Sequence, residues 1–395
     1  MKKIIILGIT ASALIIITFF LIDYLNKDTL LIKASPAPFN ISIAGKNYAN
    51  KDSLKLKLKK GSYAILITKD GYANYETNAE MIPGKITEIS ATLRPLVLTK
   101  EVDIKNLGGE VIFPTLSKDK AYLQYLTYRG TQFVRNSFEG DKLELLTSQH
   151  FKNIEEAIWS PNKDKIIIRM LAEENIKTQI YDFNLQTLSS LDNNIKSLSW
   201  SPDGQKIAYV LNSNNSFSLY ISAPDGSNPE KIIDLLNEVQ IKWQVENKLF
   251  AFSDRSLLSI DVKSKKQETI EEGEIIGLET SPKKIAYVKV VDNSPELFVA
   301  AVDGKNKEPL KIASLKDKFV WFSDDSLLVA SPYSISSDFR ENAPTSDQFW
   351  LINTVDKSKS GLTSRGEDID VSWILINNKQ VSFVSKGRLY TFNSE

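Results

Sequence analysis

The stretch SWSPDGQKIAYV, residues 199–210, places a tryptophan, a turn sequence and an alternating apolar run next to one another. Pro202 presets the backbone for the second position of a turn, and Gly204 accepts the left-handed conformation that the fourth position requires. Large apolar residues recur at every second position on both sides of this turn. The stretch therefore predicts two antiparallel strands joined by a tight turn.

Related stretches recur along the chain. Their first residues are Leu116, Trp159, Trp200, Trp243, Thr280, Trp321 and Trp373. The intervals between them are 43, 41, 43, 37, 41 and 52 residues, and further strand-like segments such as SLYISAPDG follow several copies. A period of about 40–45 residues with four strands per unit is typical of β-propellers. Because five of the seven copies begin with Trp, we expect this ring to pack between neighbouring blades.

The W-S-P-D-G motif followed by I-A-Y resembles the repeat of the TolB-like family of WD-type β-propellers. The resemblance implies an all-β propeller over residues 96–395, for which we expect seven blades, with six as the alternative. The final repeat ends with RLYTFN, residues 388–393, while LVLTKEVDI, residues 96–104, precedes the first repeat without a partner of its own. Pairing these two segments would close the ring and cover both edges.

The N-terminus carries an uncharged apolar run from Ile4 to Ile22, which is long enough to span a bilayer as a helix. Lys2 and Lys3 precede this run and favour a cytoplasmic N-terminus. We therefore expect an uncleaved transmembrane signal-anchor at residues 1–24, a linker at residues 25–35, and all that follows on the extracytoplasmic side of the cell membrane. A cleaved signal peptide is the alternative.

Residues 36–95 alternate between apolar and polar side chains, as in LKLKLK at residues 54–59. This period of two predicts a small antiparallel sheet or sandwich with one buried face. The run G-x-Y-x-I-x-I-x-K-x-G-Y, from Gly61 to Tyr72, resembles the PEGA domain. The resemblance implies a small β-sandwich that acts as a surface module next to other envelope domains.

The composition narrows the chemistry that this chain can perform. His150 is the single histidine and there is no cysteine, so thiol nucleophiles, Cys/His zinc sites and haem ligation have no residues to carry them. No G-x-S-x-G, phosphate-binding glycine loop or dinucleotide motif occurs. Residues 1–95 carry a net charge of +6 and residues 96–395 a net charge of −6, which is not a nucleic-acid-binding profile. We expect neither a cofactor nor a metal ion.

Carboxylate clusters leave one enzymatic alternative open. They fall between the last strand of one repeat and the first strand of the next: Glu155–Glu156, Glu271–Glu272 with Glu274, and Glu367–Asp368 with Asp370. A lyase or glycosidase could use such pairs at the mouth of a propeller. The simpler interpretation is that they are solvated turn residues.

Recognition is expected on the face opposite the SPDG turns, because variable loops on a rigid scaffold commonly carry binding residues. The longest such loop is Ser331–Asp347. The candidate partner-binding residues are Tyr128, Arg129, Asp254, Arg255, Tyr333, Phe339 and Arg340. We therefore expect a membrane-anchored binding or scaffolding protein of the cell envelope, whose partner is a protein or a polysaccharide. The sequence leaves the oligomeric state open.

Overall fold

The computed structural model is built almost entirely from β-strands. It describes residues 27–82, 85–102, 110–127, 131–138, 142–336, 339–341, 343–364 and 369–394. Within these ranges, the single helical element is the short 3-10 helix η1 (Phe339–Glu341), and no helix is long and apolar enough to cross a membrane. The predicted anchor at residues 1–24 lies outside the described residues. The chain divides into two compact units, which are described separately.

The N-terminal unit contains two sheets. One has the order β4 (Ser53–Lys59), β1 (Lys27–Ser35), β7 (Ile86–Thr92), and the other runs β6 (Tyr75–Met81), β5 (Gly61–Thr68), β2 (Phe39–Ile43), β3 (Lys46–Lys51). Buried apolar residues from both sheets, among them Ile32, Ile41 and Ile67, form one core. The alternating pattern thus buries one face of each sheet, and the predicted small β-sandwich is confirmed.

The predicted linker at residues 25–35 is corrected by the structure, because β1 occupies most of it and forms the middle of its sheet. β1 pairs antiparallel with β4 and parallel with β7. Leu30 and Ile32 are fully buried. Leu30, Leu31 and Ile32 form a continuous apolar run without the alternation that marks a strand with one exposed face.

A segment distant in sequence also belongs to the N-terminal unit, which includes residues 351–364. In this segment β32 (Lys359–Gly361) pairs antiparallel with β6, with Lys359 opposite Glu76 and Ser360 opposite Tyr75. The Gly361 amide donates to the Asn74 carbonyl at 3.0 Å. The sequence repeat had placed these residues wholly in the propeller.

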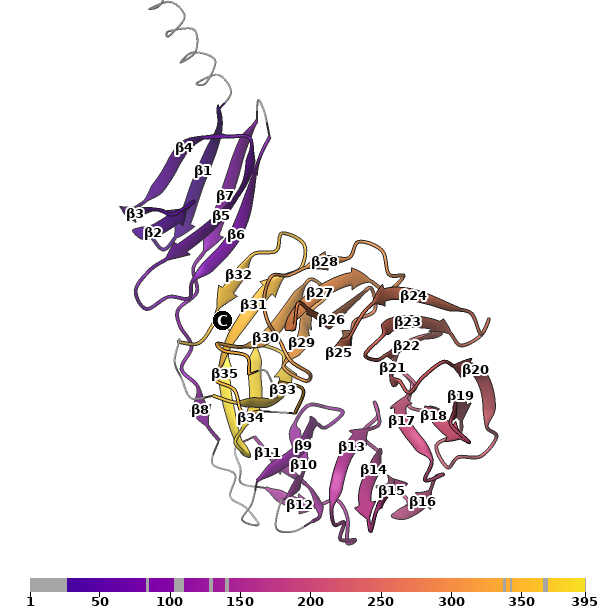
Figure 1. Ribbon diagram of the computed structural model, residues 1–395. Coiled ribbons are helices and arrows are strands. Elements are labelled where there is room, and N and C mark those ends of the chain that lie inside the picture. Colours follow the sequence, from indigo (N-terminus) through magenta and orange to yellow (C-terminus); the bar gives the residue numbers. More distant parts are fainter. Residues whose placement is uncertain are drawn as a thin grey trace, which may run out of the picture. The chain divides into compact units, whose positions relative to one another are not determined.

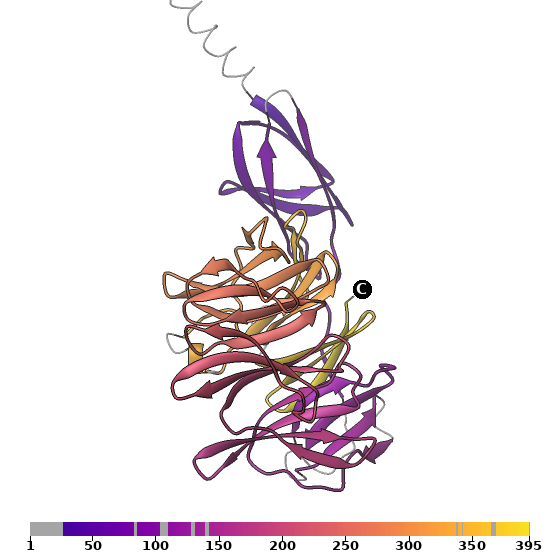
Figure 2. The same cartoon turned by 90° about the vertical axis from the view of Figure 1, so that its right-hand side faces the viewer.

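The second unit is a β-propeller, in which antiparallel sheets follow one another around a ring (Figures 1 and 2). The first three sheets are β9 (Val111–Leu116), β10 (Tyr122–Thr127), β11 (Phe133–Ser137), β12 (Leu143–Leu145); β13 (Ile154–Trp159), β14 (Lys165–Ala172), β15 (Asn175–Asp182), β16 (Thr187–Ser190); and β17 (Ile195–Trp200), β18 (Ile207–Ser213), β19 (Ser216–Ser222), β20 (Glu230–Leu235). The next two are β21 (Gln240–Val245), β22 (Lys248–Phe252), β23 (Ser256–Asp261), β24 (Gln267–Glu272); and β25 (Ile275–Thr280), β26 (Lys284–Val291), β27 (Ser294–Ala301), β28 (Glu308–Pro309). β29 (Phe319–Ser323), β30 (Ser326–Pro332) and β31 (Asp347–Asn353) continue the same order.

The last sheet closes the ring in the predicted way. It has the order β33 (Val371–Asn377), β34 (Gln380–Ser385), β35 (Arg388–Asn393), β8 (Lys100–Glu101). Tyr390 lies opposite Glu101, and the Val102 amide donates to the Leu389 carbonyl at 2.9 Å. The strand before the first repeat therefore completes the final sheet, and neither segment is left as an open edge.

The turn in the opening stretch is also confirmed. Gly204 has φ +70°, and its amide donates to the Ser201 carbonyl at 2.9 Å. The Asp203 carboxylate accepts from the Ser201 hydroxyl at 2.6 Å and from the Gln205 amide at 3.0 Å. The side chains of the motif thus satisfy the polar groups of the turn that joins β17 to β18.

Candidate functional site: a polar cavity at one face of the propeller

A cavity of about 730 Å³ lies among the inner strands β13, β17, β21 and β25. Its lining includes the first residues of β17 and β21 and residues of the β14–β15 hairpin, such as Leu171. We call this side of the ring the cavity face and the opposite side, which carries the Ser201–Gly204 turn, the turn face. The sequence analysis expected binding on the cavity face, and that expectation stays a prediction.

One wall of the cavity is held by the ion pair between Arg169 and Glu156. Arg169 Nη1 lies 3.0 Å from Glu156 Oε2, and Arg169 Nη2 donates to the Ile195 carbonyl at 3.2 Å. Arg169 Nε is buried and has no hydrogen-bond partner among the described residues. The pair therefore joins β14 to β13 and to the start of β17, with Glu156 beside a fixed positive charge.

The other wall contains the ion pair between Lys242 and Glu279, from β21 and β25. Lys242 Nζ also donates to the Leu278 carbonyl at 2.7 Å. Burial raises the pKa of Glu279, and the Lys242 ammonium opposes that effect. Because both groups are about three-quarters buried, each needs the other to remain charged inside the protein.

Two serines between these walls are already engaged. The Ser197 hydroxyl accepts from the Ile241 amide at 3.0 Å, and the Ser199 hydroxyl accepts from the Trp243 amide at 2.9 Å. These bonds join the inner strands β17 and β21. The cavity wall is therefore formed by strands that hydrogen bonds connect, and not by independent loops.

The charged side chains of the cavity that are exposed to solvent are not those of the two ion pairs. Lys196, Lys316, Asp317 and Glu155 line the cavity and are exposed. An incoming molecule would meet these flexible charged side chains first, and then the fixed ion pairs behind them. Such a surface suits a polar partner with groups of both charges, or a hydroxyl-rich one.

The carboxylates considered for catalysis lie mostly in ion pairs. Glu156 pairs with Arg169, Glu274 with Arg340 and Asp370 with Lys318. Glu271 accepts from Lys289 at 2.7 Å and contacts Lys307 at 3.3 Å. Burial raises the pKa of Glu271, but the two lysines outweigh it and hold that pKa below its usual value. Glu155 and Glu272 are exposed, and Glu367 and Asp368 lie outside the described residues.

The Lys318 cluster was not anticipated from the sequence. Lys318 Nζ contacts Asp347 Oδ2 at 2.6 Å and Asp370 Oδ1 at 3.0 Å, and it also donates to Thr345. Asp347 Oδ2 also accepts a hydrogen bond from the Val371 amide at 2.8 Å. Burial raises the pKa of Asp347, and Lys318 opposes it. The cluster connects the starts of β29, β31 and β33, which are distant in sequence.

The candidate binding residues fall into three groups. Asp254 and Arg255 are exposed in the β22–β23 turn on the cavity face, and Tyr333 is half-buried at the start of the long loop. Tyr128 and Arg129 lie outside the described residues. The third group comprises Phe339 and Arg340, which are treated next.

Phe339 and Arg340 hold the Ser331–Asp347 loop against the propeller. Phe339 is 6% exposed, so its ring is not presented to a partner. Arg340 forms two hydrogen bonds to Glu274, at 2.6 and 2.7 Å, and its guanidinium lies 4.5 Å from the centre of the Phe339 ring. In this structure these two residues make contacts inside the protein, and Arg340 binds Glu274, which directly precedes β25.

His150 and the acidic residues offer no metal centre in the part of the chain that the structure describes. His150 is exposed, and its Nδ1 lies 3.2 Å from the Thr131 hydroxyl. Among the described residues there is no group of three or more His, Cys, Asp or Glu side chains arranged to hold a metal ion.

Comparison with known proteins gives the family of the first unit and the fold of the second. Residues 28–96 match the PEGA domain. Among solved structures, an oligogalacturonate lyase from Vibrio parahaemolyticus matches with a TM-score of 0.52 and 11% identity, over 75% of this chain and 97% of that one. A virginiamycin B lyase from Staphylococcus aureus matches with a TM-score of 0.51 and 11% identity, over 75% and 99%.

A TolB protein from Agrobacterium tumefaciens is also similar, with 18% identity over 55% of this chain and 81% of that one and a TM-score of 0.41. No curated protein matches. At these identities the similarity to solved structures concerns the fold alone. Residues 28–96 are therefore a PEGA domain, and the second unit has the fold of a β-propeller.

Proposed function

We propose that this protein is a membrane-anchored binding or scaffolding protein of the cell envelope. In this proposal the N-terminal apolar segment spans the cell membrane, and the PEGA domain and a seven-bladed propeller lie outside it. The cavity face of the propeller contacts a protein or polysaccharide partner. The observation that carries the proposal is the polar cavity of about 730 Å³, whose wall is fixed by ion pairs and whose entrance carries exposed charges.

The charges of the cavity favour binding over proton transfer. A general acid must hold a proton near neutral pH, which requires a raised pKa. Glu156 is held in an ion pair with Arg169, with 3.0 Å between Glu156 Oε2 and Arg169 Nη1. Glu279 has a raised pKa but is locked to Lys242 and does not face the lining as a free group. These pairs support a rigid recognition surface.

The rival function is a lyase or glycosidase that uses Glu155 and Glu156 at the cavity. Both residues line it, and Glu155 is exposed. Two of the similar structures are named as lyases, but that similarity concerns the fold. An assay of the purified protein on envelope glycans separates the two functions, because turnover that disappears in Glu155→Gln would establish an enzyme.

The proposal is tested by charge reversal at the entrance of the cavity. Lys196→Glu with Lys316→Glu should reduce capture of the partner from cross-linked, solubilised envelopes by at least about tenfold, since like charges then face the bound groups. The matched control is Lys263→Glu with Lys266→Glu, in the β23–β24 turn on the turn face, where both lysines are exposed. Equal capture by both double variants would contradict binding at the cavity face.

A further inference from the structure

One end of the PEGA domain gathers three chain segments. The pairing register places Lys27 opposite Lys59, Thr29 opposite Ile86, and Gly61 opposite Met81. The start of β1, the β4–β5 turn and the β6–β7 connection therefore lie at the same end, as Figure 1 shows. We call this end, defined by Lys59, Lys60, Ile82, Lys85 and Ile86, the domain tip.

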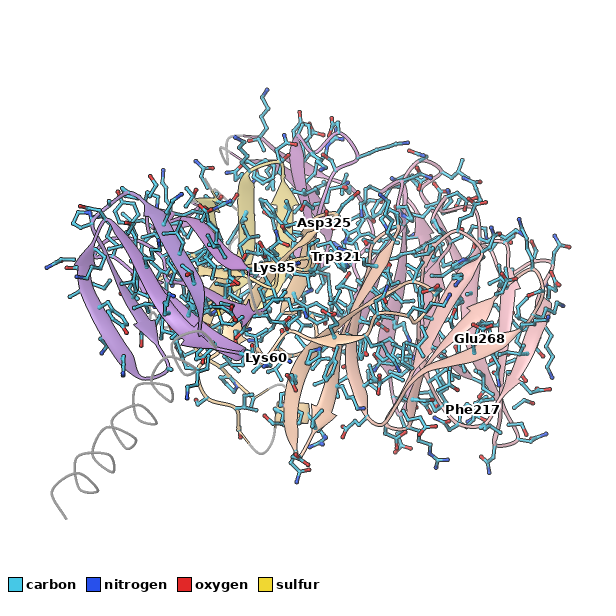
Figure 3. All side chains as sticks on the ribbon, turned by 90° about the horizontal axis from the view of Figure 1, so that it is seen from above. Lys60, Lys85, Phe217, Glu268, Trp321 and Asp325 are labelled. Atoms are coloured by element: carbon cyan, nitrogen blue, oxygen red, sulfur yellow. The ribbon has the colours of Figure 1, made fainter. Side chains whose placement is uncertain are left out.

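The domain tip combines exposed apolar side chains with positive charge. Ile86 is 68% exposed and Ile82 is 49% exposed, although both belong to a residue type that is normally buried. Lys60 and Lys85, which are labelled in Figure 3, are exposed beside them. Among the described residues of this end, Glu80 is exposed opposite Ser62 and Asp28 is buried, so the exposed lysines outnumber the exposed acid.

The connection between the apolar N-terminal run and the domain tip is short. The uncharged run ends at Ile22, and β1 begins at Lys27, so fewer than five residues separate the two. An extended chain covers at most about 3.5 Å per residue. If the run spans the membrane, the tip is held within roughly 20 Å of the lipid headgroups by the chain itself.

We propose that the domain tip docks on an anionic lipid bilayer, with Ile82 and Ile86 inserted among the headgroups and Lys60 and Lys85 beside the lipid phosphates. Exposed apolar residues flanked by lysines are the usual composition of surfaces that lie in a membrane interface. The short connection raises the effective concentration of the tip at the bilayer, so individually weak contacts suffice. This inference rests on the proposed membrane anchor.

The chain offers a clean test because it contains no cysteine. Ile86→Cys carries an environment-sensitive fluorophore at the tip, and Val355→Cys carries the same fluorophore as the control. Val355 is 66% exposed and belongs to the same unit, but it lies close to β32, which pairs with the first residues of β6 rather than the last. The two labelled positions therefore have nearly equal exposure and lie near opposite ends of β6.

The full chain is reconstituted into vesicles of phosphatidylcholine and phosphatidylglycerol that contain a headgroup spin label. We expect the protein to float with the vesicles, the label at residue 86 to be quenched at least about twofold, and the label at residue 355 to be unaffected. Quenching at residue 86 should be lost in Lys60→Glu with Lys85→Glu, and in phosphatidylcholine alone, while flotation persists.

Four results overturn the inference. Flotation without quenching at residue 86 refutes docking but leaves the anchor intact. Equal quenching at residues 86 and 355, or quenching that survives both the charge reversal and the removal of phosphatidylglycerol, refutes a specific contact with anionic lipid. Failure of the full chain to float refutes the anchor and, with it, the docking.

Discussion

The indole Nε1 of Trp200 donates a hydrogen bond to the Ile158 carbonyl at 2.9 Å, from one sheet of the propeller to the preceding one. Trp159 repeats this relationship with the Phe113 carbonyl, also at 2.9 Å. In both cases the last residue of an inner strand reaches the preceding inner strand. The recurring tryptophan therefore supplies both apolar area and a directed bond between neighbouring sheets.

The relationship is not present in every repeat. Trp243 and Trp321 occupy the corresponding positions, but their Nε1 atoms are buried and have no hydrogen-bond partner in the part of the chain that the structure describes. Trp321 is labelled in Figure 3. Trp373 contacts the ring of Phe113 edge-on, with 5.8 Å between the ring centres. Packing of the ring is thus the shared property, and the hydrogen bond is an addition in some repeats.

This difference predicts unequal effects of the same substitution. Trp200→Phe removes the bond and leaves the Ile158 carbonyl without that donor, whereas Trp243→Phe removes a buried N–H that has no partner. Both rings are almost fully buried, at 4% and 6% exposure. We expect Trp200→Phe to lower the free energy of unfolding by about 1 kcal/mol more than Trp243→Phe, measured by denaturant titration. Equal losses would show that the bond contributes nothing.

The Gly204 turn predicts a second effect on stability. A Cβ atom at residue 204 would lie 3.1 Å from Asn162 Nδ2 and 3.3 Å from Pro161 Cδ, and φ is +70°. Gly204→Val should therefore cost about 1–3 kcal/mol, seen as a lower melting temperature. Gly204→Asn is the control, because Asn tolerates the left-handed conformation better, and it should cost less. An unchanged melting temperature in Gly204→Val would contradict this account of the turn.

Lys163 occupies the equivalent turn position in the preceding sheet, with φ +61°. Burial lowers its pKa to about 8. Between this value and the ordinary value of 10.5, the unfolded chain binds more protons than the folded chain, so stability rises with pH across that window. Below pH 8 the folded protein carries the full penalty of burying this charge.

Lys163→Gly should remove both the burial penalty and the backbone strain. We expect it to stabilise the protein by about 1 kcal/mol at pH 7, with a gain that shrinks as the pH approaches 10. Denaturant titrations of both proteins at pH 7 and pH 10 measure this. A gain that stays constant with pH would leave the backbone effect but refute the role of the buried charge.

The buried Lys318 cluster predicts a large loss from a single substitution. Lys318→Met keeps the apolar stem but leaves Asp347, which is fully buried, without its cation. Removing one member of a buried pair costs about 3–5 kcal/mol. Lys231→Met is the control, because its partner Asp234 is 73% exposed, and we expect no measurable change in its denaturation midpoint. Similar denaturation midpoints for the two variants would contradict the assigned importance of the cluster.

The parts of the fold that could be predicted from the sequence are those with a local signal. The Ser201–Gly204 turn, the four-stranded repeat and the closing strand at Lys100–Glu101 are encoded by turn residues and by a fixed period. β1 and β32 were missed because their strand character depends on pairing with distant segments, which no local pattern records. The Lys318 cluster was missed for the same reason.

The same distinction between local and long-range signals applies to the residues of the candidate site. Sequence reasoning named Glu155 and Glu156 as carboxylates of an enzymatic alternative, and both line the cavity. It did not identify Arg169 and Lys242, because each is defined by an ion pair across strands. It named Phe339 and Arg340 as candidate partner-binding residues because they lie in the longest loop, and in the structure the first is buried and the second is paired with Glu274.

The central claim, that the cavity face holds an envelope partner, is tested most directly by photocross-linking in intact cells. A photoreactive residue replaces Lys196 at the cavity or Lys263 on the turn face, since both side chains are exposed. We predict a discrete cross-linked adduct from residue 196, absent from residue 263, that disappears in Lys316→Glu. Adducts of equal yield from both positions, or none from residue 196 while residue 263 reacts, would contradict the claim.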